Sequence, residues 1–236
     1  MTAPVYVALG DSISIDEYAG GPGRGGASLL FRNRDDDFPD WRGRDLSTGQ
    51  PDAAFALLAT DGATVETLER SQLARLDRLD RRPTLVTLTI GGNDVLSCYG
   101  DTRTALATVD EVADAVTRVR EHLQEVLAPD GRVVVGTVYD PSDGTADAER
   151  LHLPPWPGAV EVLAELNASL RRVAAEGGAA VAEIARVFLG HGLLAGDPSR
   201  PEARPPARDV WFCSVIEPNA WGAGGVREAF WGALGG

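Results

Sequence analysis

The chain has 236 residues, of which 44% are hydrophobic and 24% are charged, values that are ordinary for one globular domain with a sizeable core. Its formal net charge of −13 argues against a nucleic-acid partner, because binding to a phosphate backbone requires a basic surface. No apolar run reaches the roughly eighteen residues that a membrane span needs, so we expect no membrane partner and a cytoplasmic protein.

The order of the predicted elements is that of an α/β protein. Five short apolar runs, of the kind found in strands buried on both faces, lie at about residues 4–9, 53–59, 84–90, 132–138 and 179–184. Helical patterns cover residues 109–128 and 158–176, and a last helix is expected at about 222–234. This alternation predicts right-handed βαβ crossovers and a parallel sheet of about five strands between layers of helices.

Residues 15–48 interrupt the alternation. We expect them to form a long loop insertion, with about one helical turn, in a single domain that spans residues 1–236. The insertion is the most basic part of an acidic chain, and Arg32 and Arg34 are candidate substrate-binding residues because guanidinium groups suit carboxylate or phosphate groups. Pairing with the neighbouring aspartates is the structural alternative, and the sequence leaves both open.

Four short motifs fall at the ends of strands. In chain order they are Gly10-Asp11-Ser12, Asp61-Gly62-Ala63-Thr64, Gly91-Gly92-Asn93-Asp94 and Ile216-Glu217-Pro218-Asn219. Ligands of an open parallel sheet bind outside the carboxyl ends of its strands, so these motifs are expected at one site. Backbone N–H groups of a serine and a glycine, together with an asparagine side-chain N–H, can converge there on one developing negative oxygen.

These motifs resemble those of the SGNH (GDSL-type) hydrolases, a family of esterases and acylhydrolases, and the resemblance covers nearly the whole chain. It implies a three-layer α/β/α flavodoxin-like sandwich and a serine hydrolase that cleaves an ester or another acyl bond of a small-molecule substrate, without a cofactor. By the resemblance, Ser12 is the nucleophile, and its backbone N–H, the Gly62 N–H and the Asn93 side chain form the oxyanion hole. Asp11 is then a structural acid that hydrogen-bonds loop backbone, and we include it among the candidate substrate-binding residues.

The fourth motif departs from the family pattern, in which an aspartate and a histidine stand three residues apart at the start of the last helix. Aligned on Pro218-Asn219, the histidine position holds Glu217 and the aspartate position holds Ser214. A serine hydroxyl is a weak nucleophile and needs a base within hydrogen-bond reach. The departure therefore leaves the base of the expected hydrolase open.

His191 and Glu217 are the candidates for this base. His191 follows the fifth predicted strand between two glycines. One hypothesis is a rearranged triad, in which His191 is the base and Glu217 orients its ring. A second is that Glu217 itself takes the proton from Ser12, which requires desolvation to raise its pKa. The third is a non-hydrolytic descendant that binds or transforms a small molecule in the same pocket, using Glu217 without an acyl-enzyme.

Cysteine and aromatic residues add two smaller expectations. Cys98 and Cys213 are too few for a disulfide scaffold and lack the spacing of metal ligands, so we expect two unpaired thiols and no metal. Four aromatic residues bracket the late loops, where they either line an apolar acyl pocket or pack against the last helix: Trp156, Trp211, Phe212 and Trp221. The sequence carries no indication of an oligomeric state.

Overall fold

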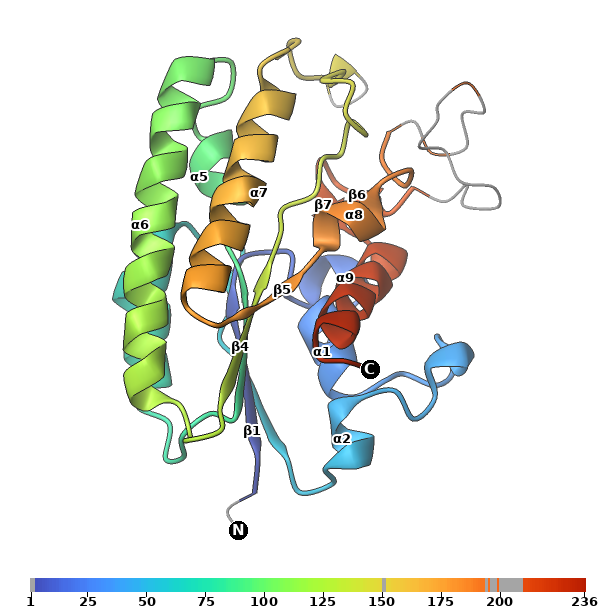
Figure 1. Cartoon of the computed structure of the whole chain (residues 1–236). Helices are drawn as coiled ribbons and strands as arrows, with labels where there is room; N and C mark the ends of the chain where they lie inside the picture. Colours follow the sequence, from blue (N-terminus) through green and yellow to red (C-terminus); the bar gives the residue numbers. More distant parts are fainter. Residues whose placement is uncertain (1–2, 150–151, 194, 196–198, 200–209) are drawn as a thin grey trace.

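The computed structural model describes residues 3–149, 152–193, 195, 199 and 210–236. Its centre is a parallel sheet of five strands in the order β2-β1-β3-β4-β5 (Figure 1). The strands are β1 (Val5–Gly10), β2 (Ala54–Leu57), β3 (Leu85–Thr89), β4 (Arg132–Gly136) and β5 (Ala180–Ala182). All five predicted strands are confirmed, since each lies within its predicted run or extends it by one residue.

Helices cover both faces of this sheet, with α5, α6 and α7 on one side and α1, α2 and α9 on the other (Figure 1). The helices are α1 (Gly26–Phe31), α2 (Leu46–Gly49), α3 (Val65–Thr67), α4 (Leu73–Leu76), α5 (Gly92–Leu96), α6 (Thr102–Val126), α7 (Ala159–Glu176), α8 (Ile184–Phe188) and α9 (Ala220–Ala233). The predicted three-layer α/β/α sandwich is therefore confirmed.

Alternate residues of β1 face the two helical layers. Val5, Val7 and Leu9 belong to the apolar cluster under α6 and α7. Tyr6 and Ala8 belong to the cluster that includes residues of α1 and α9. Because successive side chains of a strand point to opposite faces, a central strand covered on both sides must be apolar throughout. This burial explains why β1 is one continuous apolar run in the sequence.

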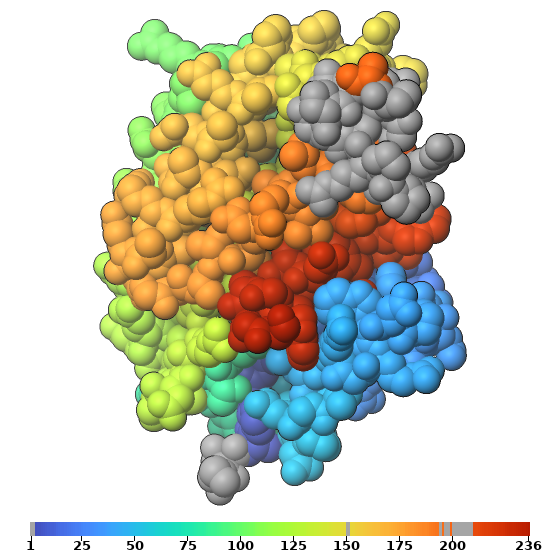
Figure 2. Space-filling model, turned by 45° about the vertical axis from the view of Figure 1, so that its right-hand side comes forward, coloured from blue at the N-terminus to red at the C-terminus, as the bar shows by residue number. Residues whose placement is uncertain are grey.

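The insertion at residues 15–48 contains more helix than predicted, and the expectation of a loop with about one helical turn is wrong. Besides α1 and α2 it contains two 3-10 segments, η1 (Glu17–Ala19) and η2 (Pro39–Trp41). Helix α1 packs against α9. A Cβ at Gly26 would lie 2.4 Å from the Val226 side chain, so a glycine permits this close approach. Figure 2 shows the blue N-terminal part of the chain beside the red C-terminal helix on one face of the molecule.

The strand order brings three of the motifs to one edge. The chain runs from β1 to β2 on one side of it and then crosses to β3 on the other side. The order of the strands therefore reverses at β1, and ligands of doubly wound sheets bind at such a point. The segments that follow these strands carry Ser12, Gly62 and Asn93, so all three residues lie near the same edge of the sheet.

Two other expectations concern single features. Cys98 and Cys213 are both free thiols, as predicted. In the part of the chain that the structure describes, none of the helices combines the length and the apolar character needed to cross a membrane. Much of the late loop region that the sequence brackets with aromatic residues lies outside the described residues, at 194, 196–198 and 200–209.

Candidate active site

Ser12 stands in the turn that follows β1. Gly10, the last residue of the strand, has a φ of 124°, and a Cβ there would lie 2.0 Å from the carbonyl oxygen of Thr89. Glycine is the residue that tolerates both this angle and this approach. The Asp11 N–H donates to the Thr89 carbonyl oxygen at 3.0 Å, and the Asp11 carboxylate accepts from the Ile13 N–H at 3.2 Å. Asp11 therefore hydrogen-bonds loop backbone, as the resemblance implied.

Gln72, which no sequence pattern singles out, holds the backbone of Gly10 in place. It is fully buried at the end of the π-helical segment η3 (Leu68–Gln72). Its side-chain oxygen accepts from the Gly10 N–H at 2.8 Å, and its amide nitrogen donates to the Gly10 carbonyl oxygen at 2.7 Å. One side chain thus satisfies both backbone groups of the last residue of the strand. A single glutamine in an otherwise polar segment gives no hydropathy signal for such a role.

The second and third motifs are linked by two side chains. The Asn93 side-chain N–H donates to the Ala63 carbonyl oxygen at 3.0 Å. Both Asp94 carboxylate oxygens accept from the Val65 N–H, at 3.2 and 3.3 Å. Gly62 precedes this contact with a φ of 65° and is exposed. A side-chain amide carries two N–H groups, so the bond to Ala63 uses one of the two donors of Asn93.

Glu217 lies in a ribbon of two short antiparallel strands, β6 (Phe212–Cys213) and β7 (Glu217–Pro218). Cys213 is its partner across the ribbon. The preceding residue, Ile216, accepts a hydrogen bond through its carbonyl oxygen from the Tyr139 hydroxyl at 2.6 Å. Two residues after Glu217, the Asn219 side chain caps α9. Glu217 is therefore held by its neighbours on both sides and is not itself the helix cap.

The carboxyl group of Glu217 is half-buried beside Ser12. Burial raises its pKa, a hydrogen bond with the Ser12 side chain opposes this shift, and the charge of Asp61 adds to it, so that the net change is upward. Among the described residues, the buried Oε2 atom of Glu217 has no hydrogen-bond partner. A desolvated and partly unpaired carboxylate binds a proton more readily than an exposed one. Glu217 is thus a stronger base than an ordinary surface glutamate.

Burial and nearby negative charges also raise the pKa values of two neighbouring groups, Asp11 and Tyr139. Burial raises the pKa of the Asp11 carboxyl to about 7, and the charge of Glu217 contributes to the increase. Burial, followed by the charges of Glu217 and Asp11, also raises the pKa of Tyr139 well above its usual value. The residues around Ser12 therefore favour protonated carboxyl and hydroxyl groups.

His191 lies against Trp211, with the two ring centroids 3.5 Å apart and the ring planes inclined by 16°. Its loop is held by Asp143, whose carboxylate accepts from the backbone N–H groups on both sides of His191 at 3.0 and 3.1 Å. The histidine is buried. The structure thus places Glu217 against Ser12 and stacks His191 on an indole ring, and a role of His191 as the base stays a prediction.

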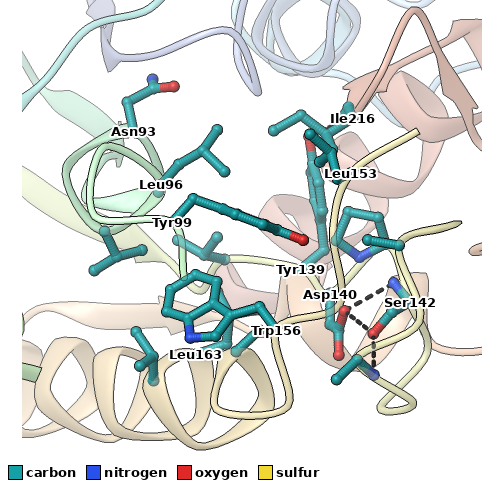
Figure 3. Close-up of a pocket in the computed structure, with 18 of the residues that line it drawn as sticks. Asn93, Leu96, Tyr99, Tyr139, Asp140, Ser142, Leu153, Trp156, Leu163 and Ile216 are labelled. Carbon is teal, nitrogen blue, oxygen red and sulfur yellow. Dashed lines mark hydrogen bonds between the residues drawn. The ribbon is translucent and has the colours of Figure 1, made fainter. Parts of the chain in front are cut away.

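Ser12 and Asn93 border an apolar cavity of about 130 Å³. Its walls come from α5 and the residues after it, from residues 138–148 and 153–156, from the start of α7 and from Ile216 (Figure 3). Among the described residues that line it, the charged ones are Asp11, Asp140 and Asp147. The cavity therefore suits a small apolar group next to the serine and offers no described cation to an anionic group.

Arg32 and Arg34 do not line this cavity. They border a separate groove that includes Phe55 of the edge strand β2. Arg34 forms an ion pair with Asp37 at 2.9 Å, and the Arg32 side chain donates to the Ser47 hydroxyl at 3.3 Å. Local pairing is therefore observed for Arg34, whereas binding of substrate by either arginine stays a prediction. In the described ranges, His, Cys, Asp and Glu side chains do not gather in threes as the ligands of a metal ion would.

Comparison with known families matches residues 8–222 to the GDSL-like lipase/acylhydrolase family. The chain belongs to this family. The family indicates a hydrolase that acts on acyl bonds, and the match extends over all four motifs. Comparison with curated proteins by sequence gave no match.

Several solved structures of other proteins share the fold. A phospholipase A1 from Streptomyces albidoflavus has a TM-score of 0.61 and 24% identity, with 99% of each chain covered. A member of the lipolytic G-D-S-L family from Veillonella parvula has a TM-score of 0.63 and 16% identity, with 96% of each chain covered. An acetylxylan esterase from Geobacillus stearothermophilus has a TM-score of 0.60 and 14% identity, covering 99% of this chain and 94% of the other. At these identities the likeness shows the architecture of this GDSL-like chain.

Proposed function

We propose that this GDSL-like protein hydrolyses esters, or related acyl compounds, whose acyl group is small and apolar, with Ser12 as the nucleophile and Glu217 as its base. The position of Ser12 carries the proposal, because it borders the apolar cavity and its side chain lies close enough to Glu217 to lower the pKa of that carboxyl. A serine needs a neighbouring base to become a nucleophile. The phospholipase and the acetylxylan esterase among the structural neighbours support an acyl bond as the target.

In the first half of the reaction, the Ser12 hydroxyl oxygen attacks the acyl carbonyl carbon while Glu217 accepts the hydroxyl proton. The backbone N–H groups of Ser12 and Gly62 and the second side-chain N–H of Asn93 donate to the developing oxyanion. The bond to the leaving alcohol then breaks, and Glu217 returns the proton to the alcohol oxygen. In the second half, Glu217 takes a proton from water, whose oxygen attacks the acyl carbon of the acyl-enzyme. The bond between this carbon and Ser12 Oγ then breaks, Glu217 returns the proton to Ser12 Oγ, and the carboxylic acid is released.

The base is tested by comparing Glu217→Gln, His191→Gln and a control, Glu66→Gln, on p-nitrophenyl butyrate. We expect kcat/KM to fall by about 10²- to 10⁴-fold in Glu217→Gln, since removal of a general base has this effect. Glu66 is exposed and pairs with Arg70, so its variant should match the wild type. The base must be ionised, so kcat/KM of the wild type should fall as the pH drops through the raised pKa of Glu217.

Other outcomes would select the alternatives. A large loss in a folded His191→Gln variant, with turnover retained in Glu217→Gln, would contradict the assignment and favour the rearranged triad. The nucleophile is tested with a fluorophosphonate, which should label Ser12 covalently and fail to label Ser12→Ala. Unchanged turnover in Ser12→Ala, or no label on the wild type, would overturn catalysis through Ser12 and favour a protein that uses the pocket without an acyl-enzyme.

A further inference from the structure

Trp156 lines the apolar cavity beside Ser12, on the side away from Asn93 (Figure 3). In Figure 3, Leu96 and Tyr99 lie between Asn93, which borders the reacting end, and the indole of Trp156. Trp156 is only 6% exposed. Its ring meets the Tyr99 ring edge-on, with centroids 5.0 Å apart and an interplanar angle of 62°. An acyl chain that enters from Ser12 therefore ends against this pair of aromatic rings.

Hydrogen bonds hold both rings in place. The indole N–H of Trp156 donates to the Thr102 hydroxyl at 2.9 Å. The Tyr99 hydroxyl donates to the Pro154 carbonyl oxygen at 2.7 Å. Close packing next to this contact limits any shift, since a Cβ at Gly158 would lie 2.0 Å from the Thr102 hydroxyl oxygen. Because its polar group is bonded and its surroundings are dense, the indole is a fixed wall and not an adaptable one.

We propose that Trp156 sets the length of the acyl chain that the protein accepts, at about six carbon atoms, an inference that rests on the proposed function. The limit of about six carbon atoms follows from the cavity volume of about 130 Å³. An apolar protein cavity of about 150 Å³ holds one benzene molecule, which has six carbons. Each methylene up to this length adds favourable free energy of binding through burial of apolar surface. Longer chains meet a rigid indole and must displace packed atoms.

The charges around the cavity narrow the substrate class further. The described residues that line it include the carboxylates of Asp11, Asp140 and Asp147 and no lysine or arginine. An acyl group with a carboxylate at its far end would be placed in apolar surroundings near like charges, which is unfavourable. The cavity therefore takes uncharged straight-chain acyl groups in preference to dicarboxylic ones of the same length.

The experiment measures kcat/KM for p-nitrophenyl esters with acyl chains of two to twelve carbons. For the wild type we expect an increase of about fourfold per methylene up to about six carbons, followed by a decline. The hemisuccinyl ester should be a much poorer substrate than the butyryl ester, which has the same number of carbons. Equal turnover of the decanoyl and hexanoyl esters by the wild type would overturn the inference and leave the proposed function intact.

Variants test the residue itself. In Trp156→Ala the ratio of decanoyl to butyryl turnover should rise by at least about tenfold, because the removed ring leaves space for several carbons. Trp231→Ala is the control, since Trp231 borders a different groove, and its profile should match the wild type. Ala159→Phe tests the same inference if Trp156→Ala does not fold, because Ala159 lines the cavity and a larger side chain there should shift the optimum towards acetyl.

A binding measurement separates the inference from the proposed chemistry. In Ser12→Ala, 1-hexanol should raise the melting temperature more than 1-decanol at equal concentration, and adding Trp156→Ala should reverse this order. The melting-temperature measurement requires no turnover, so it tests the cavity even if no ester is a substrate. An unchanged order with and without the indole, or an unchanged chain-length profile in both cavity variants, would overturn the role of Trp156.

Discussion

The two residues proposed to move the proton stand on supports of different kinds. Ser12 follows a central strand whose last residue, Gly10, is bonded on both backbone groups by the buried side chain of Gln72. Glu217 stands in a ribbon whose strands have two residues each, secured by the Tyr139 hydroxyl and by the cap of α9. The bonds that hold the end of the nucleophile's strand are thus fully buried, whereas those that support the proposed base are partly buried or exposed.

A second buried amide shows that the arrangement at Gly10 is not isolated. The Asn167 side chain, on α7, accepts from the Val138 N–H at 2.7 Å and donates to the Val138 carbonyl oxygen at 2.8 Å. Val138 follows β4 and lines the cavity. In both places a side-chain amide takes over the backbone hydrogen bonds where the strand ladder stops, and a pocket or reactive turn begins there. Buried backbone groups need such partners, so these amides let the sheet end inside the protein.

The largest change in the free energy of unfolding that we expect near Ser12 depends on pH and comes from Asp11. Its pKa is about 7 in the folded protein, against 3.8 for the ordinary group. The folded state therefore holds the proton more tightly, and stability falls as the pH rises from about 4 to 7. The full shift corresponds to an upper limit of about 4 kcal/mol in the free energy of unfolding.

Asp11→Asn should remove this dependence, because asparagine keeps the acceptor for the Ile13 N–H and carries no charge. Urea denaturation at pH 4.5 and pH 8 measures the effect. The variant should gain stability over the wild type at pH 8 and show little difference at pH 4.5. A difference between the two proteins that does not grow with pH would show that Asp11 ionises without cost in the folded state.

Gln72→Leu tests the clamp that the Gln72 side chain forms through its two hydrogen bonds with the backbone of Gly10. It should have the next largest effect on stability. The substitution removes both bonds of the Gln72 side chain to Gly10, although the Gly10 carbonyl still accepts from the Thr60 N–H at 3.0 Å. Loss of the partner of the buried N–H costs about 1–3 kcal/mol, and loss of the second bond costs about 1 kcal/mol. We expect the free energy of unfolding to fall by about 2–4 kcal/mol in urea denaturation. Gln50→Leu is the matched control, because Gln50 is exposed, and it should change stability by less than about 0.5 kcal/mol. Equal effects of the two substitutions would contradict the clamp.

The sequence predicted the support of the nucleophile better than that of the base. Continuous apolar runs follow from burial on both faces, so the strands could be placed, and with them the turn that carries Ser12. The hydrogen bonds of Gln72 and Asn167 join residues far apart in the chain, and periodicity carries no information on such partners. The helices of the insertion were missed because they are short and because α1 packs on α9, where tertiary contacts outweigh local preference.

The same distinction applies within the late part of the chain. Both His191 and Glu217 could be expected near the catalytic edge from their order after the strands, but not which of them contacts Ser12. That choice depends on Asp143 and Trp211, which hold the histidine loop, and on the ribbon that presents the glutamate. Trp156 could be expected either in a pocket or against the last helix, and the structure places it in the cavity wall.

Asn219→Ala tests the support of the base and should have the smallest effect on stability. The Asn219 side chain accepts from the Trp221 and Gly222 N–H groups in the first turn of α9, at 3.0 and 3.1 Å, and loss of such a cap costs about 1 kcal/mol. The effect on activity should be larger than this figure suggests, because Glu217 lies two residues away and a small displacement of a catalytic group lowers the rate strongly. We therefore expect a loss of about tenfold or more in kcat/KM with a modest loss of stability, whereas Gln72→Leu should lower stability first. If Asn219→Ala instead lowers stability as much as Gln72→Leu and leaves kcat/KM unchanged, the ribbon is part of the global fold and its link to the base is wrong.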